Sequence, residues 1–400
     1  MTSGRSPSAS FTVPVVGIVI AAFVANLYYA QPLAAFVAQD LGIGQAHAGA
    51  IVSASQFGYG VGLFLIVPLA DTVENRRLVL VCSGLVTSAL AGLAVAPDAL
   101  TFLACGFIAG MASSGAQILT PYLFHILVPE RRGQVMGLVG AGVLATVMLA
   151  RPLALFVTAE AGWRALYGGA AILTALLGLV LSAVMTPHSS GTAMRYADTL
   201  RSMIALFAVD RRVQRRTACQ AAIFASFTLF WATTPLLLAQ RFNLGIEDIG
   251  LIALVAAGGA LTAPIAGRLA DAGLGRPAMR LAILLIAACF GGSMWAASAA
   301  SLALLALAAF LLDGAVQATQ TFSRLAVLDV STAVRGRVNA IYMTIIYMCG
   351  AAGSLAGVLV YTRFGWTTTA LLGAILAGAA LWAALAEDRR PAPAASDPPA

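Results

Sequence analysis

The sequence predicts an all-α membrane protein with twelve transmembrane helices in two six-helix bundles and both termini in the cytoplasm. Of its 400 residues, 60% are hydrophobic, only 10% are charged, and the mean hydropathy is +0.91. Soluble domains carry about 25% charged residues, so this composition excludes a soluble protein. Apolar runs long enough to cross a bilayer recur along the whole chain, and the pattern of its first half returns in its second half.

Twelve apolar stretches account for most of the chain. A helix needs about 20 predominantly apolar residues to cross the hydrocarbon core of a bilayer. The predicted spans are residues 12–32, 47–70, 78–96, 99–127, 134–157, 165–186, 217–240, 248–269, 279–298, 302–327, 338–362 and 366–386. The predicted organisation is therefore an N-terminal bundle (1–186), a linker (187–216), and a C-terminal bundle with a short tail (217–400).

Arginine supplies every basic residue and sets the predicted orientation. With the N-terminus in the cytoplasm, the cytoplasmic loops and tails hold eighteen arginines and the opposite loops hold three. Such an excess is typical of cytoplasmic loops. The net charge of +7 is thus explained by topology, and nucleic-acid binding is not expected. The linker contains six of these arginines and an amphipathic pattern at Leu200, Met203, Ile204 and Phe207, which predicts a helix on the membrane surface.

Four short motifs repeat in order at nearly constant separation. The pairs are 41–43 with 244–246, 69–71 with 269–271, 132–137 with 335–340, and 162–163 with 365–366, at offsets of 203, 200, 203 and 203 residues. Each pair lies at a matching loop. Because six spans separate equivalent positions, the two halves have the same orientation in the membrane, which is an arrangement known from rocking-bundle transporters.

These features resemble the major facilitator superfamily over about residues 12–386. The loop 67–77 (VPLADTVENRR) and its second copy 267–276 (GRLADAGLGR) stand where the family has the pattern Gly-x-x-x-Asp-basic-x-Gly-basic-basic. The first copy keeps the Asp and one Arg pair but departs from the pattern at Val67, Thr72, Glu74 and Asn75. Other stretches, such as NLYYAQPL and PERRGQVMG, are similar to a bacterial branch described as drug or metabolite efflux proteins.

The resemblance implies a cytoplasmic latch formed by Asp71, Arg76, Arg77 and Asp271. Asp71 ends span 2, and a carboxylate there is attracted to the positive N-terminal end of a neighbouring helix. The family implies that this helix is span 11, beginning near Asn339, with Arg76 as a charge partner. The alternative is a solvated surface ion pair that contributes about 0–1 kcal/mol.

Asp313 is the one acidic residue deep inside a predicted span. It lies about 16 Å along span 10, close to the bilayer midplane. Keeping an aspartate ionised there costs about 2.5–3.5 kcal/mol, so Asp313 is predicted to exchange a proton during transport. Two alternatives stay open: a neutral acid hydrogen-bonded to a neighbouring helix, and direct contact with a cationic substrate.

Arg151 is the second charge within a span, directly before Pro152. One interpretation is that its side chain reaches the nearer membrane interface. The other is that it lines the pathway and binds an anion or pairs with a carboxylate in one state. Drug–proton antiporters of the family carry Gly-Pro-x-x-Gly-Gly in span 5, whereas this chain has Arg-Pro-Leu-Ala-Leu-Phe at residues 151–156.

The resemblance places spans 1, 4, 7 and 10 around a central cavity. The residues expected to line it are Asn26, Tyr29, Gln31, Gln117, Trp231, Asp313 and Gln317. Polar side chains within spans also form hydrogen bonds between helices, so packing is the alternative role for each of them.

The predicted function is proton-coupled efflux of a small amphipathic or cationic compound by alternating access, in a monomer in the bacterial inner membrane. The alternative is uptake or facilitated diffusion of a small metabolite. An enzyme is not expected, because the three histidines lie far apart in the sequence. The five cysteines lie in apolar segments without metal-ligand spacing, so neither a metal nor a cofactor is expected.

Overall fold

Helices form the whole regular architecture of the described residues. A computed structural model of the chain describes residues 9–127, 129–187, 195–327 and 332–388. The α-helices are α1 (Ala9–Asp40), α2 (Gly49–Leu65), α3 (Asn75–Ala94), α4 (Ala99–Ser113), α5 (Ala116–Ile126), α6 (Pro129–Val184), α7 (Tyr196–Val209), α8 (Arg211–Phe242), α9 (Ile246–Ala257), α10 (Ala263–Asp271), α11 (Gly275–Ser298), α12 (Leu302–Val327) and α13 (Thr332–Asp388). Three 3-10 helices, η1 (Gln45–His47), η2 (Val67–Asp71) and η3 (Gly258–Thr262), complete the set.

Nine helical stretches of the described residues are long and apolar enough to cross a membrane. Two of them, Arg132–Val184 and Val334–Ala386, each cover two predicted spans, and the predicted span 248–269 is not among the nine. The number of crossings stays a prediction, as does the placement of the termini, since residues 1–8 and 389–400 lie outside the described ranges.

Two left-handed glycines mark the same place in the two halves. Helices α6 and α13 are each interrupted once, by Gly162 (φ 82°) and Gly365 (φ 79°), which are separated by 203 residues. Glycine is the residue that adopts positive φ without a steric penalty. A tryptophan follows each glycine and packs edge-on against an aromatic side chain of its own half: Trp163 on Phe102, and Trp366 on Phe230. The repeat seen in the sequence is thus also a structural repeat.

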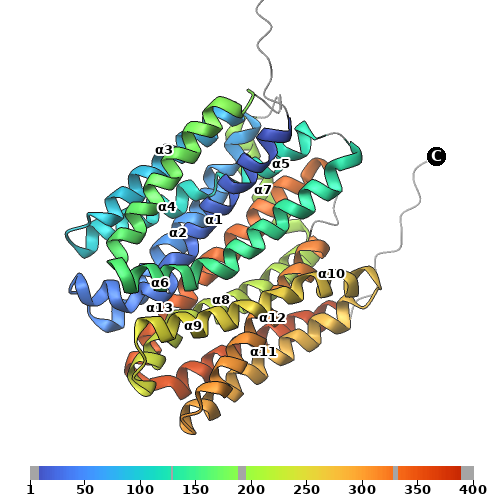
Figure 1. The fold of residues 1–400 in the computed structure, drawn as a ribbon. Coiled ribbons are helices and arrows are strands. Elements are labelled where there is room, and N and C mark those ends of the chain that lie inside the picture. Colours follow the sequence, from blue (N-terminus) through green and yellow to red (C-terminus); the bar gives the residue numbers. More distant parts are fainter. Residues whose placement is uncertain (1–8, 128, 188–194, 328–331, 389–400) are drawn as a thin grey trace, which may run out of the picture.

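The helices of the two halves form two groups that meet along a long interface (Figure 1). Along one side of this interface, α2 and the first half of α13 pack together over most of their length. Gly49 and Ser53 of α2 contact Ser354 near one end, and Phe64 packs beside Ile345 near the other. Small residues permit this close approach, as is common where membrane helices cross.

One end of the molecule gathers the arginine side chains and is here called the Arg-rich end. Hydrogen bonds at this end run from the guanidinium groups of three arginines: Arg76 to the Ser182 carbonyl (2.6 Å), Arg337 to the Ser202 hydroxyl (2.9 Å) and Arg216 to the Met279 sulfur (2.8 Å). At the opposite end, Arg164 forms an ion pair with Asp40. Asp98, also outside the spans, caps α4, and the hydrogen bond from the Thr101 amide lowers the pKa of Asp98.

Helix α7 lies across the interface at the Arg-rich end. The Tyr196 hydroxyl donates a hydrogen bond to the Leu65 carbonyl at the end of α2 (2.8 Å). Met203 is fully buried with Ala340 and Ile341 of α13. Of the four apolar residues expected to face a membrane surface, Leu200, Met203 and Phe207 pack against protein instead, and Ile204 is exposed. The amphipathic face thus binds both halves of the molecule.

A close contact between α2 and α4 generates a stability prediction. A Cβ atom added at Gly58 would lie 2.1 Å from the Phe107 carbonyl oxygen, whereas one at Gly137 meets nothing within 4 Å. We expect Gly58→Ala to destabilise the fold by about 1–3 kcal/mol, because α2 and α4 must separate. The matched control Gly137→Ala removes only a flexible residue from a helix and is expected to be neutral or stabilising. The thermal unfolding midpoints of the two detergent-purified variants measure these effects on stability. Equal midpoints for Gly58→Ala and Gly137→Ala would contradict the close approach of α2 to α4.

Candidate functional site

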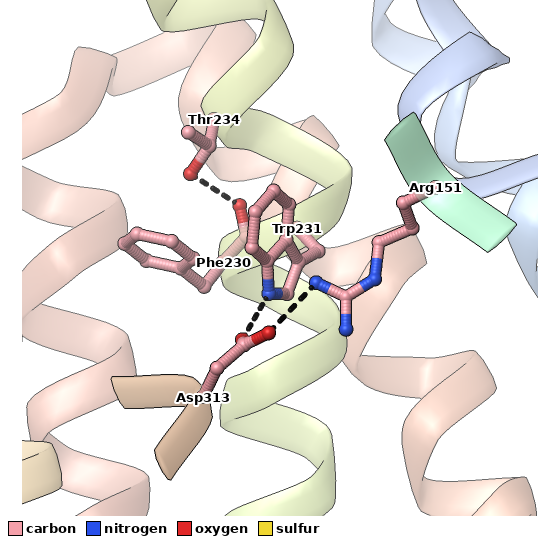
Figure 2. A network of polar contacts seen from close by, with 5 residues as sticks. All are labelled: Arg151, Phe230, Trp231, Thr234 and Asp313. Carbon is pink, nitrogen blue, oxygen red and sulfur yellow. Dashed lines mark hydrogen bonds and ion pairs between the residues drawn. The ribbon is translucent and has the colours of Figure 1, made fainter. Parts of the chain in front are cut away.

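A buried ion pair joins the two halves near the centre of the molecule. Arg151 of α6 donates a hydrogen bond through Nη1 to Oδ2 of Asp313 on α12 (3.2 Å), and Trp231 of α8 donates through Nε1 to Oδ1 (2.7 Å). Figure 2 shows the three side chains converging from three helices, with the carboxylate between both donors. Both carboxylate oxygens are therefore satisfied, which a buried charge requires.

Aromatic rings enclose the guanidinium group of Arg151. Its central carbon lies 4.2 Å from the ring centre of Trp231, 5.1 Å from that of Phe227 and 5.9 Å from that of Tyr28. Arg151 is 2% exposed and Asp313 is 3% exposed. Two roles were expected for Arg151. In the structure it pairs with a carboxylate, and its buried side chain does not extend to the membrane interface.

A close helix approach supports Asp313 from its own half. Gly259 in η3 lies against α12 so tightly that an added Cβ would be 2.1 Å from the Phe310 carbonyl oxygen. Thr262 donates a hydrogen bond to the carbonyl of Gly314, the residue next to Asp313 (2.8 Å). The interruption between α9 and α10 therefore holds the backbone that carries the carboxylate.

A cavity of about 420 Å³ begins one helical turn from the ion pair, towards the Arg-rich end. Val147 on α6 and Gln317 on α12, each four residues from a member of the pair, lie in its wall. The remaining lining residues are Tyr28, Gly137, Gly140, Ala141, Val143, Leu144, Ala263, Pro264, Gln320, Thr321 and Arg324. On the other side of the pair α6 packs closely against α9, because a Cβ at Gly250 would lie 3.1 Å from Phe156. The ion pair thus lies one helical turn from the cavity, between it and this close contact.

The residues expected around a central cavity occupy different places. Gln317 lines the cavity, whereas Trp231 and Asp313 belong to the buried ion-pair cluster and are not among the residues that line it. Gln117 lies in another cavity nearer the Arg-rich end and donates a hydrogen bond to the Tyr59 hydroxyl (3.0 Å). The side chains of Asn26, Tyr29 and Gln31 on α1 are buried, and the Gln31 amide makes no hydrogen bond to any described residue.

Sequence reasoning did not assign a site role to Tyr347 or Arg324. Tyr347 on α13 packs edge-on against Tyr59 of α2, with ring centres 4.5 Å apart, so it joins aromatic groups of the two halves. Arg324 lines the mouth of the cavity. Its position inside a predicted span was the signal that could have marked it, because charges within spans are rare and often functional. In the described ranges, no three His, Cys, Asp or Glu side chains are grouped as metal ligands.

The loop predicted to act as a latch lies beside the expected helix, at the start of α13, but its charge partner there differs from the expected Arg76. Asp71 is half-buried, and the basic residue whose charge acts on it is Arg337, five residues into α13. Arg76 instead donates to the Ser182 carbonyl within its own half, and Arg77 is exposed. The second copy, Asp271, is exposed at the end of α10. The two copies are therefore in unlike environments in this structure.

Many apolar helices, an internal repeat and a charged pair buried where the halves meet are the features of a secondary membrane transporter. The sequence profile of the Major Facilitator Superfamily matches residues 15–212 and 216–400, and the chain belongs to this family.

Several known proteins with similar sequences come from bacteria. The chain is 31% identical over 355 residues to an uncharacterized transporter, YgaY, of Escherichia coli O157:H7, covering 88% of this chain and 90% of that protein. It is 28% identical over 259 residues to a chloramphenicol resistance protein of Streptomyces lividans, covering 62% of each. A solved bacterial homologue of the human lysosomal transporter Spinster, inward-facing and unoccupied, superposes with a TM-score of 0.72 at 13% identity, covering 98% of this chain and 100% of that one. This last likeness shows the fold alone.

The ion pair generates a prediction on stability. Removing one partner leaves the other charge buried and uncompensated, so Arg151→Met is expected to destabilise the structure by about 3–5 kcal/mol. Adding Asp313→Asn removes the remaining charge, and the double variant is expected to regain much of that loss. Thermal unfolding midpoints of wild type, both single variants and the double variant complete a double-mutant cycle. Additive effects would show that the two side chains do not interact.

Proposed function

We propose that the chain is a proton-coupled secondary transporter that exports a small amphipathic compound by alternating access. The observation that carries this proposal is the buried Arg151–Asp313 pair, which connects the halves one helical turn from the cavity. A proton on Asp313 cancels the attraction to Arg151, so protonation and separation of the halves at this point favour each other. This relation is what coupling of transport to a proton requires.

In this scheme the structure corresponds to the inward-facing state. The Arg-rich end is the cytoplasmic one by the distribution of arginine, and the cavity lies on that side of the pair. An adjacent guanidinium favours the ionised carboxylate, so Asp313 releases its proton when this state forms. In the opposite state the pair separates, and Asp313 binds a proton from the other side. Proton entry thus drives export of the compound held in the cavity.

We further propose that residues 1–186 and 217–400 move as the two transport bundles and that residues 187–216 link them. Helix α7, with its contacts to Leu65 and to Ala340 and Ile341, supports closure between α2 and α13. The attraction between Asp71 of the first half and Arg337 of the second half supports the same closure, so this copy of the latch is the engaged one. Asp271 is the disengaged copy, on the side where α6 and α10 leave the cavity open. The site of action in this proposal is the bacterial inner membrane.

The first test is transport by purified protein in proteoliposomes with an imposed pH gradient. Compounds to try include chloramphenicol, which is suggested by the name of the Streptomyces relative. We expect the wild type to move at least one compound against its concentration gradient. Asp313→Asn should abolish this accumulation while leaving exchange of labelled for unlabelled compound, because it removes the proton site. Asp248→Asn, at an exposed acid, is the control and should behave as wild type.

Accumulation by the Asp313→Asn variant under the gradient would show that Asp313 is not the coupling residue. The direction of movement relative to the proton gradient distinguishes export from the alternative, uptake of a metabolite together with a proton. Transport that follows only the gradient of the compound indicates facilitated diffusion.

Small residues on α6 generate a second test. Gly137, Gly140 and Ala141 line the cavity, and an added Cβ at either glycine meets nothing within 4 Å. In the opposite, outward-facing state we expect this surface of α6 to pack against α10 and η3, in the way that α2 packs against α13 in the present structure. Asp313→Asn, which mimics the protonated acid, should then slow alkylation of a Thr321→Cys reporter in a background without native cysteines.

Adding Gly140→Leu should restore fast alkylation, because the larger side chain obstructs closure. Gly378→Leu is the matched control, since Gly378 also has nothing within 4 Å but lies outside the cavity. Rates of reaction with a membrane-impermeant maleimide measure the effect. An unchanged rate in all variants would contradict closure of this face.

A further inference from the structure

The charges around the cavity suggest the chemical class of its substrate. The lining contains hydroxyl and amide groups from Tyr28, Gln317, Gln320 and Thr321, and one charged group, Arg324. No carboxylate belongs to this lining within the described residues. A cationic compound would therefore meet no opposite charge in the cavity wall.

Asp313 does not supply the missing negative charge in this state. It is 3% exposed, and its two oxygens accept hydrogen bonds from Arg151 and Trp231. A carboxylate paired with a guanidinium has no net charge as a unit, so the pair, one helical turn from the cavity, adds no net charge to it. Asp313, for which contact with a cationic substrate was one alternative, is thus already balanced by a residue 162 positions away.

Arg324, unlike Asp313, is exposed and its charge is not balanced by an ion pair within the described residues. Its side chain lies at the cavity mouth. The groups on which its charge acts are the hydroxyls of Tyr59, Tyr342 and Tyr347, which are neutral phenols. A guanidinium group is a planar donor that matches a carboxylate or a similar anion with two parallel hydrogen bonds.

The distances along the helices set the shape of a matching ligand. Seven residues of α12 separate Gln317 from Arg324, which is about 10 Å along the helix. The apolar side chains of Val143, Leu144 and Val147 on α6 line the opposite wall. A ligand that satisfies both walls has an anionic group at Arg324 and an apolar body that extends towards the ion pair.

From these observations we infer that the transported compound is an amphipathic organic anion, such as a carboxylate or sulfonate, held through Arg324. This inference rests on the proposed function, in which the cavity carries the substrate. It keeps the amphipathic character predicted from the sequence and replaces the cationic alternative with an anion, and it gives Arg324 a binding role separate from the proposed coupling role of Asp313.

Binding of three probes that share one apolar body tests this inference. Phenylbutyrate, phenylbutylamine and phenylbutanol differ in charge, and calorimetric titration of the full-length protein in a non-ionic detergent at neutral pH gives their Kd values. We expect phenylbutyrate to bind about tenfold or more tightly than the amine, as a charge-assisted hydrogen bond predicts. Arg324→Gln should remove this preference and Arg324→Lys should keep part of it. Arg363→Gln makes the same change of charge at an exposed residue outside the cavity and should have no effect.

Three results would overturn the inference: tighter binding of the amine, a preference for phenylbutyrate that survives in Arg324→Gln, or no binding of phenylbutyrate. Inorganic phosphate that displaces phenylbutyrate at an equal concentration would also overturn it, because the site would then recognise any anion without the apolar body. Displacement by phosphatidylglycerol, but not by neutral lipid, would assign the site to a lipid headgroup instead.

The transport assay separates failure of this inference from failure of the proposed function. Proton-driven accumulation of phenylbutylamine by the wild type would refute the anionic class and leave proton-coupled transport in place. Binding of phenylbutyrate with the expected Arg324 dependence, without accumulation of any compound under a gradient, would support the site and contradict the coupling.

Discussion

A guanidinium and a carboxylate buried together stabilise a membrane protein only while they remain in contact, and this condition controls the interface between the two halves. Arg151 and Asp313 are both almost completely buried, and each would be costly alone. Their helices belong to different halves, so the halves cannot separate at this point without uncovering two charges. Protonation of the acid removes one of those charges. This is the physical basis of the proposed coupling between a proton and the relative position of the halves.

The rest of the interface is arranged around this fixed point. On the Arg-rich side of the pair, α6 presents glycines and alanine to an open cavity, and on the other side the same helix packs against Gly250. The α2–α13 contact is closed along most of its length and is covered at one end by α7. The two sides of the interface, although related by the internal repeat, thus differ in this structure. Such a difference is what a transporter needs if its two gates open in turn.

The sequence allowed correct predictions for those features of the fold that depend on a single residue or on a local pattern. The depth of Asp313 in an apolar segment marked it as a candidate functional residue before its surroundings were known, because an ionised acid there is costly whatever its partner. Gly162 and Gly365 marked the two interrupted helices through their repeated Gly-Trp pairs. The partner of Asp313 was not predictable in the same way, since Arg151 is 162 residues away and its own segment allowed two interpretations. For the same reason Arg76, a sequence neighbour of Asp71, was expected where Arg337 is found.

The sequence alone determined that the chain is a duplicated, helical membrane protein of the transporter type, because hydropathy, arginine distribution and motif spacing are properties of local segments. Only the tertiary structure decided which charges neutralise each other and which remain available. Pairing with Arg151 balances Asp313, whereas Arg324 stands at the cavity mouth beside neutral hydroxyl groups. Electrostatic compensation depends on distances between helices far apart in the chain. The expected charge of the substrate therefore changed when those distances became known.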